Sequence, residues 1–388
     1  MSLWSAGEAA ETPNPTNVGG QAVIEGVMMR APGSLSIVVR RRDGSLVVRE
    51  RTVVSPASGL VKLPLVRGMY TLVSSLKMGH QALRWSADLF EEDAEAEEAE
   101  KEAAKAKPKA KKGTGALSVL SLWLAQIASM SGDEEPGKVV DKSDDKKKGN
   151  PILSLLPIVL AIGLFVALPQ AAAAGVKRLF GLEMDVQSPL YQVITGVAKL
   201  AIIVGYMSLL RLNDLTRRVF QYHGAEHKSI STYELGRPLL LNEARGTTAL
   251  HARCGTTFII MVAFVSVVLF SVVGRFLPPI PGSELVQNVV FFLLKLPLLP
   301  VVAGLTYELQ RFFAKYCTTG PLRVLLWPGF LVQKITTAEP DDDQLEVALA
   351  SLRSALANAA VKLPANHPDQ KFSSYDVLVD NAAYRAAG

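Results

Sequence analysis

Three of the five histidines in this 388-residue sequence lie between residues 223 and 251. Two of them belong to His223-Gly224-Ala225-Glu226-His227, which reads H-x-x-E-H, the inverted form of the zincin motif. Residues four apart share one face of a helix, so both imidazoles can reach one metal ion with Glu226 beside them. Zn²⁺ suits this donor set, and the glutamate can take a proton from metal-bound water. The motif predicts a zinc site with Glu226 as general base.

A zinc site usually needs a third protein ligand, and a second motif offers two candidates. His251-Ala252-Arg253-Cys254 lies just before a long apolar segment and supplies an imidazole and a thiolate. The apolar segments on either side of this region bring the two motifs together, so we expect His251 or Cys254 to complete the site. The alternative is a chance match, in which surface histidines near a membrane bind lipid phosphates.

Acidic residues elsewhere in the chain could add to this site. Glu243 lies in the same stretch, and Glu308 follows a later apolar segment at the same face. Inverted zincins usually draw a further ligand from a later glutamate, which favours Glu308. The acidic run formed by Glu339 and residues 341–343 is better explained as the start of a helix, where negative charge is stabilised.

The composition points to a lipid bilayer as the main partner. Apolar residues make up 49% of the chain, they are concentrated in blocks, and the mean hydropathy is above zero. The net charge of +5 is small and its basic residues are spread through loops, so we expect no nucleic-acid binding. Two cysteines are too few for a disulfide framework, and the first fifteen residues show no cleaved secretory signal.

Four apolar stretches are long enough to cross a membrane. They cover residues 151–176, 190–210, 255–274 and 285–305, and their only charged residues are Lys199 and Lys295. The sequence therefore predicts an α-helical integral membrane protein with about four transmembrane helices. Residues 115–130 are also apolar but short, so whether they form a fifth span is left open.

The distribution of basic residues orients these spans, because short loops rich in Lys and Arg tend to stay in the cytoplasm. The segment 211–254, between the second and third spans, is the most basic loop. We therefore expect a multi-pass protein of the cell membrane with both termini in the cytoplasm. The basic residues of this loop are Arg211, Arg217, Arg218, Lys228, Arg237, Arg245 and Arg253.

The two lysines within the spans need an explanation, because a charge near the centre of a bilayer costs roughly 2.5 to 3.5 kcal/mol. Lys199 and Lys295 either pair with a carboxylate or line a cavity inside the bundle. If the helix ends are misplaced, the lysines instead extend to the membrane interface.

The region before the spans is expected to form a small cytoplasmic element, residues 17–90. Residues 35–53 read as two strands joined at Asp43-Gly44, a favoured hairpin turn. Residues 60–90 have helical spacing of apolar and basic residues, which suits either a helix along the membrane surface or a soluble helix packed on the hairpin. Residues 91–150 are expected to be a charged, low-complexity linker that contains the short apolar segment.

After the last span, residues 321–333 look like a membrane-surface or partly re-entrant segment. Thr336-Thr337, Pro340 and the acidic run are helix-start signals, and predict a soluble amphipathic helix within residues 336–360. The tail, residues 361–388, is polar, and we expect it to be disordered.

Five motifs follow one another along the chain: GGQAVIEGVMMR (19–30), LVRG (65–68), YHGAEHK (222–228), HARCGTTF (251–258) and ITTAEPDDDQLEVA (335–348). Together they resemble the YqhQ-like family. These are bacterial membrane proteins, with plant relatives, that carry a domain of unknown function and are catalogued as predicted metal-dependent enzymes. The match covers about residues 17–350, without the charged insert around 91–150. The resemblance implies that Glu25 and Arg30 belong to the site.

These observations predict a membrane-embedded metalloprotein, most simply a zinc-dependent hydrolase at the cytoplasmic face of the membrane. Its substrate would be a lipid head group or a membrane-associated peptide. One alternative is a non-enzymatic membrane scaffold or assembly factor that holds protein partners of unknown identity. A transporter is a second alternative, supported only by the two lysines within the spans.

Overall fold

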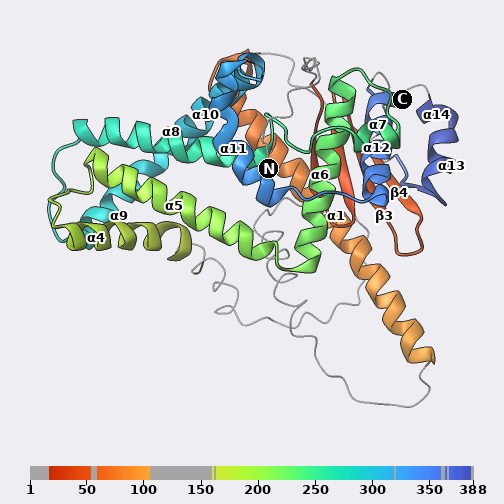
Figure 1. Cartoon of the computed structure of the whole chain (residues 1–388), viewed down its shortest axis with the longest axis horizontal. Coiled ribbons are helices and arrows are strands. Elements are labelled where there is room, and N and C mark those ends of the chain that lie inside the picture. Colours follow the sequence, from red (N-terminus) through yellow and green to blue (C-terminus); the bar gives the residue numbers. More distant parts are fainter. Residues whose placement is uncertain are drawn as a thin grey trace.

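The computed structural model describes residues 17–53, 59–104, 160, 163–318, 320–359, 363–364 and 367–385. The apolar segment 115–130 and most of the linker that contains it lie outside these residues. So do residues 151–159 and 161–162 of the first predicted span. In the described part, an antiparallel sheet with helices on both faces forms a head, from which a bundle of apolar helices extends to one side (Figure 1).

The sheet is an antiparallel meander in the order β1-β2-β3-β4-β5. The strands are β1 (Gly19–Val23), β2 (Gly26–Ala31), β3 (Ser34–Arg40), β4 (Leu46–Thr52) and β5 (Gln370–Phe372). The predicted hairpin is confirmed as β3 and β4. Its turn contains Gly44 at φ 82°, a conformation that glycine adopts without steric cost, and Asp43, which accepts a hydrogen bond from the Ser45 N–H.

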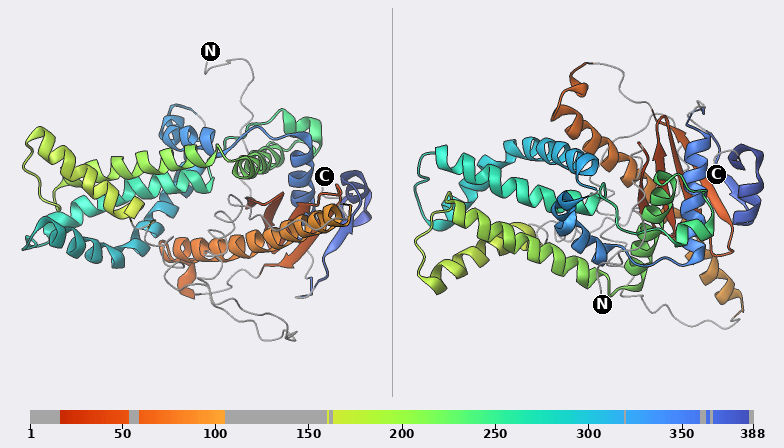
Figure 2. Two further views of the ribbon diagram at one scale, coloured as in Figure 1. Left: turned by 90° about the horizontal axis from the view of Figure 1, so that it is seen from below. Right: turned by 45° about the horizontal axis from the view of Figure 1, so that its top comes forward.

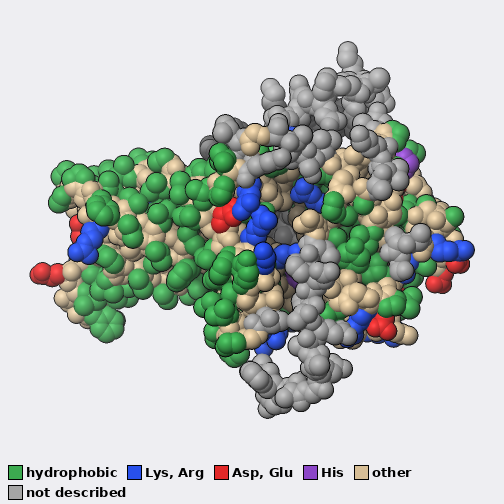
Figure 3. All heavy atoms as spheres, turned by 90° about the horizontal axis from the view of Figure 1, so that it is seen from above, with side chains coloured by type: hydrophobic (Ala, Val, Ile, Leu, Met, Phe, Trp, Pro, Cys, Tyr) green, Lys and Arg blue, Asp and Glu red, His purple; other side chains and the backbone are tan. Residues whose placement is uncertain are grey.

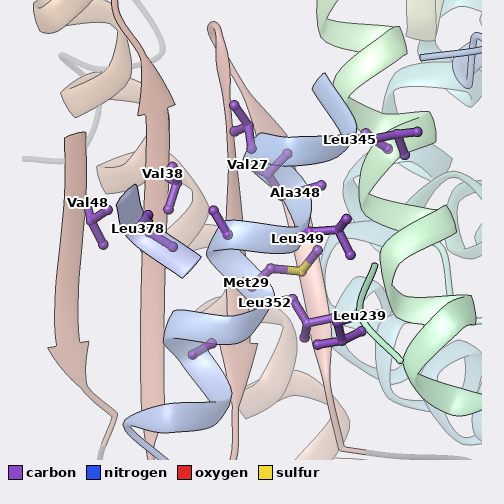
Figure 4. Packing of buried hydrophobic residues seen from close by; sticks show 14 of the residues in the cluster. Val27, Met29, Val38, Val48, Leu239, Leu345, Ala348, Leu349, Leu352 and Leu378 are labelled. Carbon is purple, nitrogen blue, oxygen red and sulfur yellow. The ribbon is translucent and has the colours of Figure 1, made fainter. Parts of the chain in front are cut away.

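One face of the sheet packs against α12 (Asp342–Ala357). The helix α6 (Asp214–Glu234) packs beside α12 in the same core. Val27, Met29 and Val38 meet Leu349 and Leu352 of α12 in the main hydrophobic core (Figure 4). The predicted helix is present within residues 336–360, but it is not amphipathic. The helix is buried on nearly all sides, and polar residues such as Ser351 and Ser354 are buried with it.

The start of α12 also differs from the prediction. Asp341, not a threonine, caps the helix, and it forms a capping box with Gln344. Thr336 instead ends the preceding helix, α11 (Trp327–Thr336). Pro340 precedes the Asp341 cap, so it lies outside the first turn of α12.

The opposite face of the sheet is covered by α1 (Val66–Ala104), which follows the short 3-10 helix η1 (Gly59–Lys62) (Figure 2). Ala82 and Trp85 pack against this face, and the Arg49 guanidinium lies 4.3 Å from the Trp85 ring centroid. The helix runs 14 residues beyond residue 90, where we expected a linker to begin. Its Ala, Glu and Lys residues are strong helix formers, and Glu97 pairs with Lys101 one turn later.

The apolar bundle contains three stretches that are long and apolar enough to cross a membrane: Pro189–Leu210, Gly255–Phe276 and Glu284–Tyr316. They correspond to the second, third and fourth predicted spans, and the last continues to residue 316 rather than 305. The bundle elements are η2 (Gly163–Ala167), α4 (Leu168–Phe180), α5 (Pro189–Leu210), α8 (Gly255–Phe276), α9 (Glu284–Lys295), η3 (Leu296–Leu298) and α10 (Leu299–Tyr316).

The face of this bundle that is seen in Figure 3 is apolar. Lys and Arg side chains gather where the bundle meets the head, and a few charged groups lie at the far tip. Side chains such as Val197, Phe264 and Val289 are more than 45% exposed along the bundle, as expected where a helix faces an apolar solvent.

The described part of the C-terminal tail forms secondary structure, whereas we expected residues 361–388 to be disordered. Within the described residues, β5 pairs with β4, and two short helices follow it, α13 (Tyr375–Asp380) and α14 (Ala382–Arg385). Leu378 and Tyr384 are almost fully buried in the main core. The tail is polar on average, but these few apolar side chains complete a core that other segments build. The remaining elements are α7 (Leu241–Arg245) and η4 (Pro321–Leu326).

Candidate metal centre

The H-x-x-E-H motif lies on α6, between the sheet and the apolar bundle. Asn213 caps the helix, and its side chain accepts a hydrogen bond from the Thr216 N–H at 3.2 Å. His223 and His227 are one turn apart, and their ring centroids are separated by 4.4 Å. Gly224 between them allows close packing, because a Cβ there would lie 2.1 Å from the Ala338 carbonyl oxygen. The helix thus presents two imidazoles to one place.

Both imidazoles are oriented by backbone carbonyls. His223 Nδ1 lies 2.9 Å from the Thr336 oxygen, and His227 Nδ1 lies 2.5 Å from the Ala249 oxygen. A carbonyl only accepts, so each Nδ1 carries the proton and donates it. In the neutral form of each ring, Nε2 then carries the lone pair, which is the arrangement common to metal-binding histidines.

Cys254 completes a cluster of three possible ligands. Ligand atoms of His223, His227 and Cys254 all lie within 4.8 Å of one another, and Cys254 Sγ is 3.3 Å from His223 Nε2. Cys254 is also the N-cap of α8, where its sulfur accepts a hydrogen bond from the Thr256 N–H at 3.4 Å. The N-terminus of a helix and nearby imidazoles both favour a thiolate.

The charges of this cluster are strongly coupled. Burial by itself would raise the pKa of the Cys254 thiol, but His227 and His223 together hold it well below its usual value. Burial lowers the pKa of His223, and the Cys254 thiolate outweighs this and raises it to about 9. Without a bound cation, the three side chains therefore hold a thiolate beside an imidazolium.

His251, the other candidate for the third position, lies next to this cluster with its ring directed elsewhere. Its Nε2 lies 3.1 Å from the Glu234 carboxylate, which also pairs with Arg253. Its ring centroid is 5.6 Å from that of His227, and burial lowers its pKa. The structure places Cys254, rather than His251, with the two histidines of α6.

Glu226 is a buried carboxylate beside the histidines. It is 5% exposed, and within the part of the chain that the structure describes no hydrogen bond or ion pair holds its carboxylate. Burial raises its pKa, and the opposing influence of His227 and His223 does not reverse this. Glycine at position 20 of β1 makes room for it, because a Cβ there would lie 2.8 Å from Glu226 Cγ.

The more distant acids predicted for the site lie elsewhere. Glu308 forms a two-pronged ion pair with Arg67 of α1, with Nε to Oε1 at 2.7 Å, and is not part of the cluster. Glu243 lies 3.9 Å from Arg237. Each belongs to a helix whose rotation directs it to a different neighbour, which residue spacing alone could not show.

The acidic run has structural partners, in line with the helix-start explanation. Asp341 caps α12, and Asp342 pairs with Arg245. Glu339 accepts from the buried Lys228 ammonium at 2.5 Å, and that ammonium also donates to the Arg245 carbonyl at 3.0 Å. These contacts join α6, α7 and α12 around the site.

Glu25 and Arg30, which the family resemblance added, are placed differently. Glu25 lies in the β1–β2 turn at φ 50°, a left-handed conformation that is uncommon for a side-chain-bearing residue. Its carboxylate accepts two bonds of 2.6 Å from Arg218 and one of 3.3 Å from Tyr222. Through Arg218 and Tyr222, Glu25 therefore fixes the part of α6 that directly precedes His223. Arg30 lies on β2, and among the described residues it makes no hydrogen bond or ion pair to the cluster.

Two glutamines, one of them buried, support the site and were not singled out from the sequence. Gln333 of α11 is fully buried and bonds to His251 and to the Thr257 hydroxyl, at 2.6 Å. Gln310 of α10 donates to the Cys254 carbonyl at 3.0 Å. Neither is near the motifs in sequence, so no local signal could have identified them.

The two lysines of the bundle face its interior. Lys295 Nζ donates to Gln192 Oε1 at 3.0 Å and lies 4.2 Å from the Phe291 ring centroid and 5.0 Å from that of Phe270. The Lys295 ammonium thus interacts with a glutamine and two aromatic rings rather than with a carboxylate. Lys199 is half-buried on α5.

Comparisons with known proteins add a family assignment. The family described as "Protein of unknown function (DUF1385)" matches residues 63–358. The "Uncharacterized protein YqhQ" of Bacillus subtilis (strain 168) is 28% identical over 347 residues, which cover 88% of this chain and 93% of the relative. No solved structure matches the chain. The family match spans well over half of the sequence and contains both histidine motifs, so the chain belongs to the DUF1385 family.

Proposed function

We propose that this chain is an integral membrane metalloprotein that binds Zn²⁺ through His223, His227 and Cys254. The observation that carries the proposal is the paired orientation of the two histidines: both Nδ1 atoms bond to carbonyls, so both Nε2 atoms are left for a ligand beside Cys254. Imidazole nitrogens and thiolate sulfur are both ligand types that Zn²⁺ uses, and a catalytic zinc site has three protein ligands and one open position.

The separation of the ligand atoms supports the fit. With Zn–S and Zn–N bonds of about 2.3 and 2.0 to 2.1 Å, sulfur and nitrogen ligands of a tetrahedral ion lie about 3.5 Å apart. Cys254 Sγ and His223 Nε2 are 3.3 Å apart. This pair would need to move apart by only a few tenths of an ångström to hold a zinc ion, whose charge would replace the imidazolium that now stabilises the thiolate.

The membrane assignment rests on the apolar bundle. Three stretches have the length and composition of spans, and basic side chains gather at the boundary with the head (Figure 3). Basic residues beside membrane spans favour the cytoplasmic side. The head and both termini would then lie in the cytoplasm, and the zinc site would lie at the membrane surface, because Cys254 directly precedes α8.

The reaction that this site suits best is hydrolysis. A bound zinc ion acts as a Lewis acid toward water and toward a carbonyl or phosphoryl oxygen. Glu226, buried and with its carboxylate unoccupied among the described residues, would accept the proton of the attacking water and return it to the leaving group. A site at this depth would act on a lipid head group or a membrane-associated peptide.

The first test is the metal content of the full-length chain purified in detergent, measured by mass spectrometry. We expect near-stoichiometric zinc in the wild type and its loss in His223→Ala, His227→Ala and Cys254→Ser. His251→Gln is the matched control, since this neighbouring histidine should not be a ligand. Loss in His251→Gln and retention in Cys254→Ser would contradict the ligand set. A well-folded wild type without metal would leave a thiolate–imidazolium pair instead of a metal site.

A second measurement separates the enzyme from a scaffold. Glu226→Gln should retain zinc, because Glu226 is not among the three ligands, and should lose hydrolysis of lipid and peptide test substrates. A fourth protein ligand seen in the X-ray absorption spectrum of the zinc protein would close the coordination sphere. That result would favour a structural site in a membrane scaffold.

A further inference from the structure

The first half of α1 carries an apolar stripe that the described part of the chain leaves uncovered. Val66, Met69, Tyr70, Val73 and Leu76 are all exposed, with Val73 at 65% and Leu76 at 64%. Their spacing of three and four residues places them on one face of the helix. Single exposed apolar residues are ordinary, but five on one face indicate a contact surface.

This half of α1 lies against α10, part of a candidate span. Arg67 pairs with Glu308, and Gly68 contacts Tyr307 so closely that a Cβ would lie 2.8 Å from Tyr307 Cβ. Gly304 of the same helix packs on Leu65. The stripe therefore continues the apolar outer surface of the bundle at the edge of the head.

The second half of α1 has different surroundings. From residue 78 onward its apolar side chains, including Met78, Ala82 and Trp85, pack on the sheet. Charge divides the helix in the same way: residues 66–87 contain no acidic residue, whereas eight acidic residues lie between Asp88 and Glu100. An anionic surface would attract the first half and repel the second.

We infer that residues 66–77 of α1 lie in the boundary layer of the membrane, with the apolar stripe against the acyl chains. The stripe is about 15 Å long at 1.5 Å per residue, which suits a helix that anchors the head rather than one that spans. This inference rests on the proposed membrane embedding of the bundle.

A bilayer fits the stripe better than a soluble protein partner does. The stripe adjoins α10, so a protein that covered it would have to sit partly within the membrane boundary. The absence of acidic residues from this half of α1 also matches anionic lipid. Coverage by a protein, whether another protein or a second copy of the chain, is a separate outcome of the experiment.

Fluorescence quenching by brominated lipid tests the inference. The full-length Val73→Cys variant is labelled with an environment-sensitive fluorophore and reconstituted into vesicles of phosphatidylcholine and phosphatidylglycerol, with or without brominated acyl chains. Ala96→Cys, exposed on the acidic half of the same helix, is the matched control. Val272→Cys, exposed on α8, reports on the bundle itself. Wild type gives the background from the two buried cysteines.

We expect quenching at position 73 to reach at least half of that at position 272, with none at position 96. Quenching at 272 but not at 73 would overturn the inference and leave the membrane embedding intact. A blue-shifted emission at 73 without quenching would also overturn it, because a protein would then cover the stripe. Quenching at neither position would refute the embedding of the bundle itself.

Discussion

The side-chain amide of Gln333 binds both backbone groups of His251. Its Oε1 accepts from the His251 N–H at 2.8 Å, and its Nε2 donates to the His251 carbonyl at 2.8 Å. The same Nε2 reaches the Thr257 hydroxyl, so one buried side chain holds both ends of the turn that carries Cys254. The position of the thiolate thus depends on a residue of α11, far away in the sequence.

Replacing Gln333 by leucine should weaken zinc binding without removing a ligand. The change leaves backbone groups of His251 unpaired, and loss of such supporting contacts typically lowers metal affinity about 10- to 100-fold. Competition with a coloured chelator measures the affinity. Gln287→Leu is the control, because it also removes a bond to a backbone carbonyl, that of Ile280, at the far end of the bundle. Equal zinc affinity in wild type and Gln333→Leu would show that the turn from His251 to Cys254 keeps its conformation without Gln333.

The adjacent glycines of β1 should respond differently to alanine. A Cβ at Gly20 would lie 2.8 Å from Glu226 Cγ and from the Met28 carbonyl oxygen, whereas a Cβ at Gly19 meets nothing within 4 Å. We expect Gly20→Ala to lower the free energy of unfolding by about 1 to 3 kcal/mol and Gly19→Ala to change it by less than about 0.5 kcal/mol. Denaturant unfolding of the two variants side by side measures the difference, and similar values would contradict the packing of β1 on Glu226.

Removal of zinc should expose Cys254 to alkylation. A thiolate held by neighbouring imidazoles reacts readily with maleimides, whereas a metal-bound sulfur is protected. We expect mass spectrometry to find Cys254 modified after treatment with a chelator and unmodified in zinc-loaded protein. Cys317, which is fully buried, is the internal control and should stay unmodified in both. Modification of Cys254 at the same rate in both samples would argue against its role as a ligand.

Truncation of Tyr384 should destabilise the head, although the residue lies near the end of the chain. Its ring is 1% exposed and lies 5.9 Å from the Phe372 ring of β5, so Tyr384→Ala leaves a cavity in the main core. We expect a loss of about 3 kcal/mol in the free energy of unfolding. Val377→Ala, at a half-exposed position of α13, should change it little. If both variants change the free energy of unfolding only slightly, the result would instead support the disordered tail that the composition suggested.

Several features were predictable because they depend on near neighbours in the chain. The β3–β4 hairpin follows from strand residues on either side of Asp43-Gly44, and the three candidate membrane spans follow from runs of apolar residues. The placement of His223 and His227 on one helical face follows from their spacing of four. In each case the physical cause acts over a few residues, so the local pattern was sufficient.

Other features depend on packing between segments that are distant in the sequence. Apolar residues too sparse to suggest order, such as Leu378 and Tyr384, become buried because β4 and α12 provide the rest of their core. The helix α12 looks amphipathic by itself, but the sheet and α6 cover it on both sides. Composition averages over a segment, whereas burial depends on what surrounds each side chain.

The sequence by itself determined which residue types could form the site, and the tertiary structure decided which of them meet. Spacing offered His251 and Cys254 equally, but Glu234 holds the His251 ring while the start of α8 directs the Cys254 sulfur to His223. Glu308 was an equally reasonable ligand until its helix paired it with Arg67. The direction of a side chain depends on the rotation and packing of its element, and contacts with distant segments set both.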